Sequence, residues 1–430
     1  MGRKTILVLY YTRGVYPLRN TIETHLYAFR RYSRHRTIYI NIALGFPWEY
    51  VRSMAIDAII FHTSFCGMRW SRPVFFKFTA MIREMADYPA LKIAMPQDEF
   101  IHTDLLSKII EDLKVDVVLS CAEESEWPVI YAKVDRKRVT FKTVLTGYLD
   151  EETVRKIEKF HKPLAARSHY ITYRAWRAAF WIGEHGTHKV RIGEVFEKAA
   201  KARGVRTDIS LNDGDTIAGL DWFRFLADSR AVIGVEGGAS IIDPDGVLKQ
   251  RVEDYVERNP DADFETVRDA CFKDHEGSLN LKALSPRHLE AAAAKTCQVL
   301  MDGHYNGVLT ADRHYIPVRS DYSNLDEVFE KLANDGLVQN LIDQSYEDLI
   351  QRSDLTYEGF VKGIEDEFIS PLRDKNAPFK DIFKRIILNW RDWINWRIIQ
   401  AELEYSKDPG RYRIFARFLR PLYRLFVQPL

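Results

Sequence analysis

The sequence is constrained most by short apolar runs that alternate with stretches of helical length. Runs rich in Ile and Val, and too short to be helices, are typical of strands buried on both faces. In the first part of the chain these runs are Thr5–Tyr11, Ile38–Ala43, Ala58–His62, Leu91–Met95 and Val115–Cys121. The amphipathic stretches between them are Leu18–Ser33, Pro73–Tyr88 and Thr103–Leu113. This alternation predicts βαβ units, and therefore a parallel sheet with helices on both faces.

The pattern weakens near Val139–Lys162 and then restarts, which indicates a second domain of the same kind. Its expected strands are His169–Tyr173, Arg206–Leu211, Ala231–Glu236 and Cys297–Asp302. Its expected helices are Lys189–Arg203, Asp221–Ser229, Pro286–Lys295 and Asn324–Asn334. We therefore predict an α/β protein with two Rossmann-like doubly wound domains, residues 1–150 and 151–340.

Two further regions complete the predicted organisation. Residues from about 239 to 284 interrupt the second domain and carry two expected helices, Val247–Glu257 and Phe264–Phe272. Residues 341–430 are expected to form a helical extension that crosses to the first domain. Two doubly wound domains in tandem bring the carboxyl ends of both sheets to one crevice, where open α/β sheets bind ligands.

The composition excludes several classes of protein. With 62 Lys and Arg against 61 Asp and Glu, the formal net charge is +1, so a protein that coats nucleic acid is not expected. A hydrophobic content of 46% excludes wholesale disorder. We expect no nucleic-acid partner.

The cysteines and the start of the chain indicate a cytoplasmic protein. None of Cys66, Cys121, Cys271 and Cys297 forms a C-x-x-C pair, so neither a zinc ribbon nor a disulfide framework is indicated. The chain enters a strand-like run at once, without a signal-peptide pattern, and it has no apolar stretch of about 18 residues. A cytoplasmic location is therefore expected.

The segment AVIGVEGGAS places Glu236, Gly237 and Gly238 directly after an expected strand. Two glycines allow a backbone to approach a ligand closely, and the carboxylate would face the crevice. The alternative is an ordinary turn at a strand end with a solvated glutamate. The segment alone leaves both interpretations open.

A helix start follows at LSPRHLEAAAAK. Ser285 is suited to cap this helix and Pro286 to occupy its first position. Arg287 and His288 then lie in the first turn, where a cation opposes the positive end of the helix dipole. A phosphate bound at the helix N-terminus would remove this conflict, whereas a surface ion pair of Arg287 is the structural alternative. Glu290 lies one turn further on and could accept two ribose hydroxyls.

These two segments resemble the C-terminal half of a GT-B glycosyltransferase of the group 1, family-4-like type. In that family a strand, a glutamate with glycines and a helix with a second glutamate form a Glu-x7-Glu motif. Glu236 resembles the first glutamate and Glu290 the second, with the insertion between them. Counted back strictly from Glu290, the first position is Lys282. The motif is therefore either split by the insertion or lacks its first acid.

The next segment, GHYNGVLTADRHYIPVRSDYSNLDEVFEKL, extends the resemblance. It is similar to a bacterial subgroup with a SPRHFEA…HYIPL…SNLDEV-like pattern, whose members act in the synthesis of surface polysaccharides. The resemblance covers about Thr172 to Leu332, and over residues 1–150 it is only architectural. It implies a GT-B fold, a nucleoside diphosphate sugar as donor, retention of anomeric configuration and catalysis without a metal ion or other cofactor.

The resemblance also indicates a pair of donor-binding cations at the start of the second domain. The family holds the donor diphosphate with an Arg and a Lys just after the first strand of this domain. Arg174 and Lys189 resemble that pair, at a longer spacing. The structural alternative for both residues is an ordinary surface charge.

The first domain is expected to hold the acceptor. His62 ends an apolar run and would bind a hydroxyl or phosphate at the crevice, or else be a satisfied buried histidine. Asp98 and Glu99 follow another strand, and either could act as general base or cap the next helix. Glu123, Glu124 and Glu126 compete for the same role.

Asp243-Pro244-Asp245 has the spacing of a D-x-D motif, which holds a divalent cation in other proteins. The motif lies in the insertion, and its proline suits a turn. We therefore assign no metal ligands.

The end of the chain has the pattern of a membrane-surface segment. RYRIFARFLRPLYRLFVQPL, residues 411–430, contains five arginines, several aromatic residues and no acid. Trp390, Trp393 and Trp396 precede it at intervals of three, and MRWSRPVFFKFTAMIRE (68–84) is a second candidate. Basic amphipathic segments of this kind bind anionic lipid surfaces. The alternative is a tail packed across the first domain, with Arg side chains covering apolar surface.

Together these patterns predict a glycosyltransferase that moves a sugar from a nucleoside diphosphate sugar to a glycan or lipid-linked glycan. Attachment to the cytoplasmic face of the inner membrane is expected through residues 411–430. Two alternatives remain open: a sugar-nucleotide epimerase of the same fold, and a non-catalytic scaffold of a glycan-assembly complex.

Overall fold

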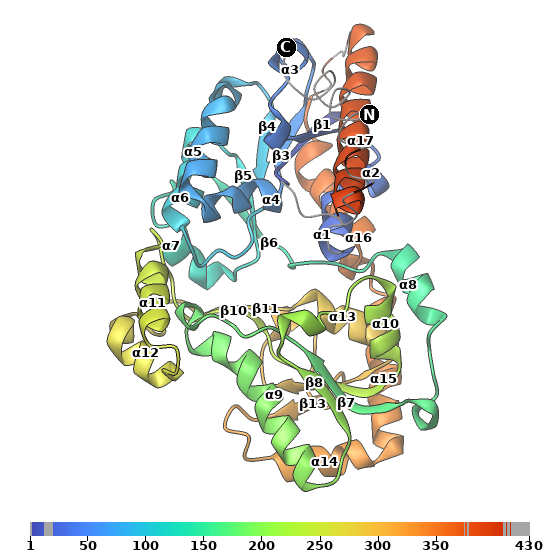
Figure 1. The fold of residues 1–430 in the computed structure, drawn as a ribbon. Helices are drawn as coiled ribbons and strands as arrows, with labels where there is room; N and C mark the ends of the chain where they lie inside the picture. The colour runs from blue at the N-terminus through green and yellow to red at the C-terminus, as the bar shows by residue number, and fades with distance from the viewer. Residues whose placement is uncertain are drawn as a thin grey trace.

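The structure is a computed structural model, and it describes residues 2–12, 20–373, 375, 378–406, 410 and 413. Two α/β halves face each other (Figure 1). The first contains a six-stranded parallel sheet in the order β2-β1-β3-β4-β5-β6. Its strands are β1 Thr5–Tyr10, β2 Arg36–Asn41, β3 Ala58–Phe61, β4 Leu91–Ala94, β5 Val117–Ser120 and β6 Thr140–Thr143. The five predicted strands are confirmed, and β6 is an additional, half-exposed edge strand.

The helices of the first half flank this sheet (Figure 1). They are α1 Asn20–Leu26, α2 Ala28–Tyr32, α3 Trp48–Val51, α4 Thr63–Cys66, α5 Arg72–Met81, α6 Thr103–Asp112 and α7 Trp127–Ile130. The strands β1, β3 and β5 are buried along their whole length, as their Ile- and Val-rich sequences predict. The sheet therefore lies at the centre of the first core.

The second half repeats the design with a five-stranded parallel sheet in the order β13-β12-β9-β7-β8. Its strands are β7 His169–Arg174, β8 Thr207–Ser210, β9 Ser229–Gly234, β12 Cys297–Met301 and β13 Ile316–Val318. Its helices are α8 Glu151–Glu158, α9 Glu184–Ala202, α10 Leu220–Ala227, α13 Pro286–Ala293 and α14 Leu325–Ala333. The chain order reverses between β7 and β9, which is where doubly wound sheets bind ligands.

The insertion is closed at its base and attached to the first half. β10 Gly237–Ala239 pairs with β11 Leu281–Ala283, and the helices α11 Val247–Arg258 and α12 Phe264–Cys271 lie between them. Asp243 exchanges two backbone hydrogen bonds with the loop after β4, donating to the carbonyl of Phe100 at 2.8 Å and accepting from His102 at 2.8 Å. The Trp181 ring packs against Phe100 at a centroid distance of 6.1 Å. The insertion therefore links the two halves.

The C-terminal region is helical, and its helices contact the first half. α15 Asp335–Ile350 is followed by α16 Tyr357–Ile364, a π-helical turn Glu365–Ile369 and α17 Lys380–Ser406. The rings of Tyr357 and Phe360 contact His25 of α1. On α17, the Asn389 amide donates to the Thr37 carbonyl at 3.0 Å, so this helix covers the open edge of β2.

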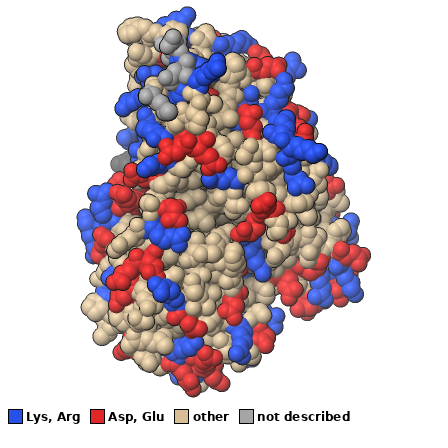
Figure 2. Space-filling view, turned by 180° about the vertical axis from the view of Figure 1, so that it is seen from behind, with Lys and Arg blue, Asp and Glu red and all other residues tan. Residues whose placement is uncertain are grey.

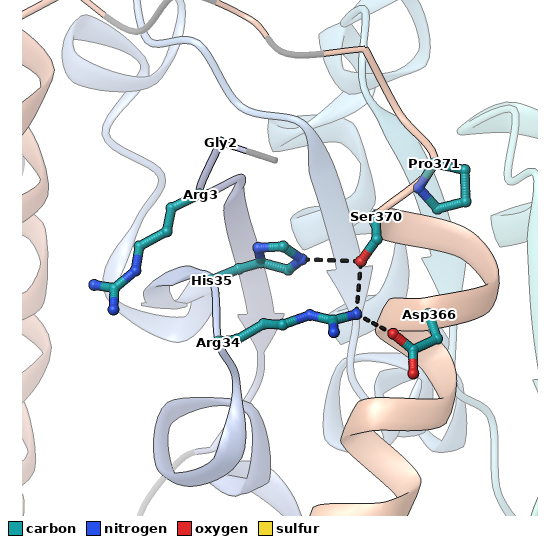
Figure 3. A pocket seen from close by; sticks show the side chains of 7 residues that line it. All are labelled: Gly2, Arg3, Arg34, His35, Asp366, Ser370 and Pro371. Atoms are coloured by element: carbon teal, nitrogen blue, oxygen red, sulfur yellow. Dashed lines mark hydrogen bonds and ion pairs between the residues drawn. The ribbon is translucent and has the colours of Figure 1, made fainter.

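A cavity of about 600 Å³ lies where the π-helical turn after α16 meets the first half. Figure 3 shows the Arg34 guanidinium reaching the Asp366 carboxylate and the Ser370 hydroxyl. Four of its lining residues, Gly2, Arg3, Arg34 and His35, precede β1 or β2, so the cavity opens at the amino ends of these strands. It is therefore remote from the crevice at the carboxyl ends.

Residues 411–430, the predicted membrane segment, lie outside the described residues apart from Arg413. No helix in the described part of the chain combines the length and apolarity needed to cross a bilayer.

The attachment of the insertion yields a stability prediction. The Asp243 carboxylate accepts hydrogen bonds from the backbone N–H groups of Gly246 and Lys249 at 3.0 and 2.8 Å, at the start of α11. Asp243→Ala removes this cap and is expected to lower the free energy of unfolding by about 1–2 kcal/mol, measured by urea denaturation. Asp261→Ala, at an exposed position of the same insertion, is the control and should change it little. Equal stability of the two variants would contradict the capping role.

Candidate functional site

Where the second half faces the first, it carries two cations from different elements. Lys189 lies in α9, and Arg287 lies in the first turn of α13. The Tyr173 hydroxyl at the end of β7 donates to the Lys189 carbonyl at 3.1 Å. The Arg287 guanidinium donates to the Arg174 carbonyl at 3.0 Å. The end of β7 thus holds both elements, and both cations lie at the switch point of the sheet.

The Lys189 ammonium is in an unfavourable environment for a charged group. Burial lowers its pKa, and the charge of Arg287 lowers the pKa further. Only Asp98, from the first half, raises it. Among the described residues, no acid forms an ion pair with either Lys189 or Arg287. The pair therefore has the charge and the accessibility that binding of an anion requires.

The opening of α13 is capped from within the chain by neutral groups. The backbone N–H of Ser285 donates to Nδ1 of His288 at 3.2 Å, as in a capping box. Burial lowers the pKa of His288 to about 3, so its ring is neutral at ordinary pH. His288 therefore supports the helix start, and Arg287 is the group in this turn that faces outward. The first turn of α13 contains no acidic residue that would stabilise the positive end of the helix dipole.

Arg174 differs from the other two cations because it already has an acidic partner. Its guanidinium forms an ion pair with Asp208 at 2.7 Å and donates to the Asp208 carbonyl at 2.9 Å. It also lies 4.6 Å from the centroid of the Phe225 ring. The contribution of Arg174 to the site is therefore its backbone carbonyl, which accepts from Arg287, whereas its guanidinium is already paired with Asp208.

Glu290 lies one turn beyond Arg287 on α13, as predicted. Its carboxylate accepts a hydrogen bond from Nε1 of Trp222 in α10 at 2.8 Å. Burial raises its pKa, whereas the indole N–H and Arg287 lower it. Glu290 is therefore held in a fixed position beside the cation pair.

Glu236 lines a separate but adjoining cavity of about 430 Å³, together with His185, His188 and Lys282. Its carboxylate accepts from the Tyr305 backbone N–H at 2.7 Å. His185 and Lys189 lie one turn apart on α9, so this cavity adjoins the cation pair. Both Glu236 and Lys282, the two alternatives for the first position of the motif, thus face one cavity.

The two glycines after Glu236 are explained by strand pairing within the chain. Gly238 has a φ of +123°, and a Cβ there would lie 1.9 Å from the Leu281 carbonyl oxygen of β11. A Cβ on Gly237 would lie 3.4 Å from the Ala283 carbonyl oxygen. The close approach expected at this position is made by the chain's own backbone, which is a correction to the expected approach of a ligand.

In the first half, Asp98 faces the crevice and Glu99 does not. Burial raises the pKa of Asp98, against the charges of Arg69 and Lys189, so it lies across the crevice from the cation pair. Glu99 is fully buried and accepts from Ser120, Tyr131 and the backbone of Cys121. The role of general base expected of Glu99 does not fit this position, because the carboxylate is enclosed and fully hydrogen-bonded.

His62 is a buried histidine, 3% exposed, as the structural alternative predicts. Its Nδ1 accepts from the Ser64 backbone at 3.1 Å and so caps α4, and its Nε2 lies 2.9 Å from Nδ1 of His25. Burial lowers the pKa of His62 well below its usual value and that of His25 to about 4. A direct contact of His62 with an acceptor does not fit this geometry.

Two of the three glutamates that compete with Asp98 and Glu99 for the role of general base connect the two halves of the molecule. Glu123 accepts from the Asn306 amide at 2.9 Å, and Glu126 accepts from the Asn280 backbone at 2.9 Å. Glu124 is exposed.

Asp243 of the D-x-D spacing caps α11, and the described residues contain no group of three or more His, Cys, Asp or Glu arranged to hold a metal ion.

Three residues of the site were not predicted: Tyr173, His185 and Trp222. His185 lies before the expected helix Lys189–Arg203, and it joins the site because α9 begins earlier, at Glu184. Tyr173 and Trp222 carried no signal in the sequence, since their contacts with α9 and α13 depend on how distant segments pack.

No protein-family model matches the sequence, and no curated protein matches it. Among solved structures, an alpha-glucosyltransferase in complex with UDP-glucose and DNA containing an abasic site is similar over 86% of this chain and 100% of its own length, at 11% identity and a TM-score of 0.52. Sucrose-phosphate synthase from Thermosynechococcus elongatus (9% identity, 86% and 99% covered, TM-score 0.49) and Anabaena HepE in complex with UDP (10%, 86% and 100%, 0.47) are also similar. The chain spans 54% of the length of TarM. The fold is GT-B.

The electrostatics of the cation pair can be tested without any ligand. Asp98→Asn removes the acid that raises the pKa of Lys189, so this pKa should fall. Arg287→Ala removes a like charge, so the pKa of Lys189 should rise. Both are measured from the pH dependence of Lys189 acetylation by mass spectrometry, with exposed Lys198 of the same helix as internal standard. An unchanged pKa in both variants would contradict the proximity of these groups.

Proposed function

We propose that this chain is a glycosyltransferase that takes a sugar from a nucleoside diphosphate sugar. The observation that carries the proposal is the pair of half-buried cations, Lys189 and Arg287, without an acidic partner among the described residues. The pair lies at the switch point of a GT-B fold, beside the opening of α13. A diphosphate supplies the two negative charges that such a site requires.

The neighbouring groups fit the rest of such a donor. Glu290, held by Trp222, is placed to accept ribose hydroxyl groups beside the diphosphate. The cavity that contains Glu236 and Lys282 has a volume of about 430 Å³, which suits a single sugar. Ser285 and His288 shape the helix opening, and Arg174 fixes the loop after β7. Gly237 and Gly238 pair with β11, which carries Lys282 of the same cavity.

Stabilisation of the leaving group is the main catalytic effect in this proposal. As the bond to the sugar breaks, negative charge develops on the diphosphate, and fixed cations and a helix dipole stabilise it without reorganisation. The proposed transfer uses no metal ion and retains the anomeric configuration. Asp98 is the acid on the acceptor side that faces this site.

For the acceptor we propose a glycan or lipid-linked glycan of polysaccharide synthesis, used at the cytoplasmic face of the inner membrane. The five arginines and the aromatic residues of 411–430 support attachment to an anionic surface. The similar alpha-glucosyltransferase was solved in complex with DNA. We do not propose DNA as an acceptor for this chain, because its formal net charge is only +1. Figure 2 shows acidic and basic side chains interspersed over one face, without a basic field.

Binding of a nucleoside diphosphate tests the donor site. Isothermal titration with UDP, and with GDP and ADP as alternatives, should give binding of one of them at or below millimolar concentration. Arg287→Ala and Lys189→Ala should each weaken it by about 10- to 100-fold, because each removes a charge-assisted hydrogen bond. Lys198→Ala removes the same charge from the exposed side of α9 and should leave affinity unchanged. Absence of binding by all three nucleotides would contradict the donor site.

Turnover separates the three functions. A transferase consumes a nucleotide sugar faster when glycan acceptor is present, and it releases the free nucleoside diphosphate. An epimerase converts the nucleotide sugar in the absence of acceptor and releases no free nucleoside diphosphate. A scaffold neither consumes the nucleotide sugar nor releases the diphosphate. We expect acceptor-dependent release, reduced about 100-fold or more in Arg287→Ala, since this residue stabilises the developing charge. Proton NMR of the product should show the donor's anomeric configuration, and inversion would contradict the retaining assignment.

A further inference from the structure

One face of α17 consists of large apolar side chains that are exposed to solvent. Their exposed fractions range from 37% for Ile382 to 75% for Phe379. The members of this apolar face are Phe379, which directly precedes the helix, and Ile382, Phe383, Ile386, Ile387, Trp390 and Trp393 within it. Their spacing of three and four residues places them along one side of a helix. A continuous apolar stripe of this size marks an interaction surface, because soluble surfaces rarely expose one.

The opposite face of α17 is anchored in the first half. Leu388 and Asp392 are each 2% exposed. The Asp392 carboxylate accepts from the Tyr10 hydroxyl at 2.6 Å and from Arg30 at 2.8 Å. The Asp381 carboxylate accepts from the Ala55 backbone at 2.9 Å. These contacts fix the rotation of the helix, so the apolar face points away from the core.

The charges of α17 are divided between the same two faces. Both acids between residues 379 and 398, Asp381 and Asp392, are buried on the inner face. The exposed bases Lys380 and Arg397 lie towards the two ends of the apolar face, and the Arg397 guanidinium is 5.5 Å from the centroid of the Trp393 ring. The outward side therefore combines apolar and basic residues, with no described acid.

After a stretch that contains Glu402, Glu404 and Asp408, the sequence returns to this combination. Residues 411–430 add five arginines and no acid. A second copy of the chain would bring like charges together in a self-complementary contact, which is unfavourable. An anionic lipid surface offers an apolar interior beneath negative headgroups, and it matches both properties at once.

We propose that the apolar face of α17 inserts into the interfacial region of an anionic membrane. The helix lies flat on the bilayer, with Trp390 and Trp393 at headgroup level and Lys380 and Arg397 against the phosphates. Because α17 packs on β2, the first half of the protein is the half next to the membrane (Figure 1). This surface is separate from the cation pair, so it does not rest on the proposed donor site.

Vesicle binding of the full-length protein tests this proposal. Wild-type protein should co-sediment with vesicles of phosphatidylcholine and phosphatidylglycerol, and more weakly with phosphatidylcholine alone. The double variant Ile386→Glu/Trp390→Glu should bind the anionic vesicles about tenfold more weakly or less, because two apolar contacts become charged. Both positions are exposed, so folding should be preserved, which circular dichroism checks. Val247→Glu is the matched control, since Val247 of α11 is also exposed but lies in the insertion, outside this face and outside residues 68–84.

Three results would overturn the proposal. One is failure of the wild-type protein to bind anionic vesicles. Another is that Ile386→Glu/Trp390→Glu binds anionic vesicles as strongly as wild type, whereas Arg417→Glu/Arg420→Glu abolishes binding. This pair of results would assign the membrane contact to residues 411–430 alone. The third is a dimer that dissociates in the double variant without a change in vesicle affinity, which would assign the face to a second copy. UDP affinity is measured in parallel, and an unchanged value in the double variant shows that the effect is confined to α17.

Discussion

Lys189 and Arg287 are two like charges near each other in a crevice, without a described acid to pair with either. Burial and mutual repulsion both disfavour the charged state of Lys189, as the direction of its pKa shift shows. Such an arrangement persists only where the surrounding structure imposes it. Here β7 imposes it, because its terminal residues hold α9 through Tyr173 and α13 through the Arg174 carbonyl. An anionic ligand would relieve the repulsion, and the proposed function rests on that relief.

The rest of the molecule fixes the crevice around this pair. The insertion joins the loop after β4 through Asp243, and this loop also carries Asp98, the acid that faces Lys189. Beneath it, the buried Arg69 donates to four backbone carbonyls of the first half, including those of Gln97 and Asp98. On the other side, α16 and α17 pack on the first half. Segments distant in sequence thus determine the separation of the two halves.

The fold was predictable because its information is local. Apolar runs and helical stretches correctly predicted the strands of the two parallel sheets except the polar β6 and the short β13, as well as the helices α11 and α12 of the insertion. The separate strand pair β10 and β11 was not predicted. The site was predictable only in part. Lys189, Arg287 and Glu290 could be named from helix position and family resemblance, but the ion pair of Arg174 with Asp208 and the enclosure of Glu99 depend on tertiary packing. Gly238 shows the same limit of prediction from sequence. A glycine is needed wherever another group approaches the backbone closely, and the sequence does not tell whether that group is a ligand or, as here, a paired strand.

A crystal structure of the protein soaked with the nucleoside diphosphate that binds most tightly tests the central claim most directly. The account predicts that the diphosphate lies between the Lys189 ammonium and the Arg287 guanidinium, at the opening of α13, with the ribose towards Glu290. A nucleotide bound elsewhere, with Lys189 and Arg287 still free of any anion, would contradict it.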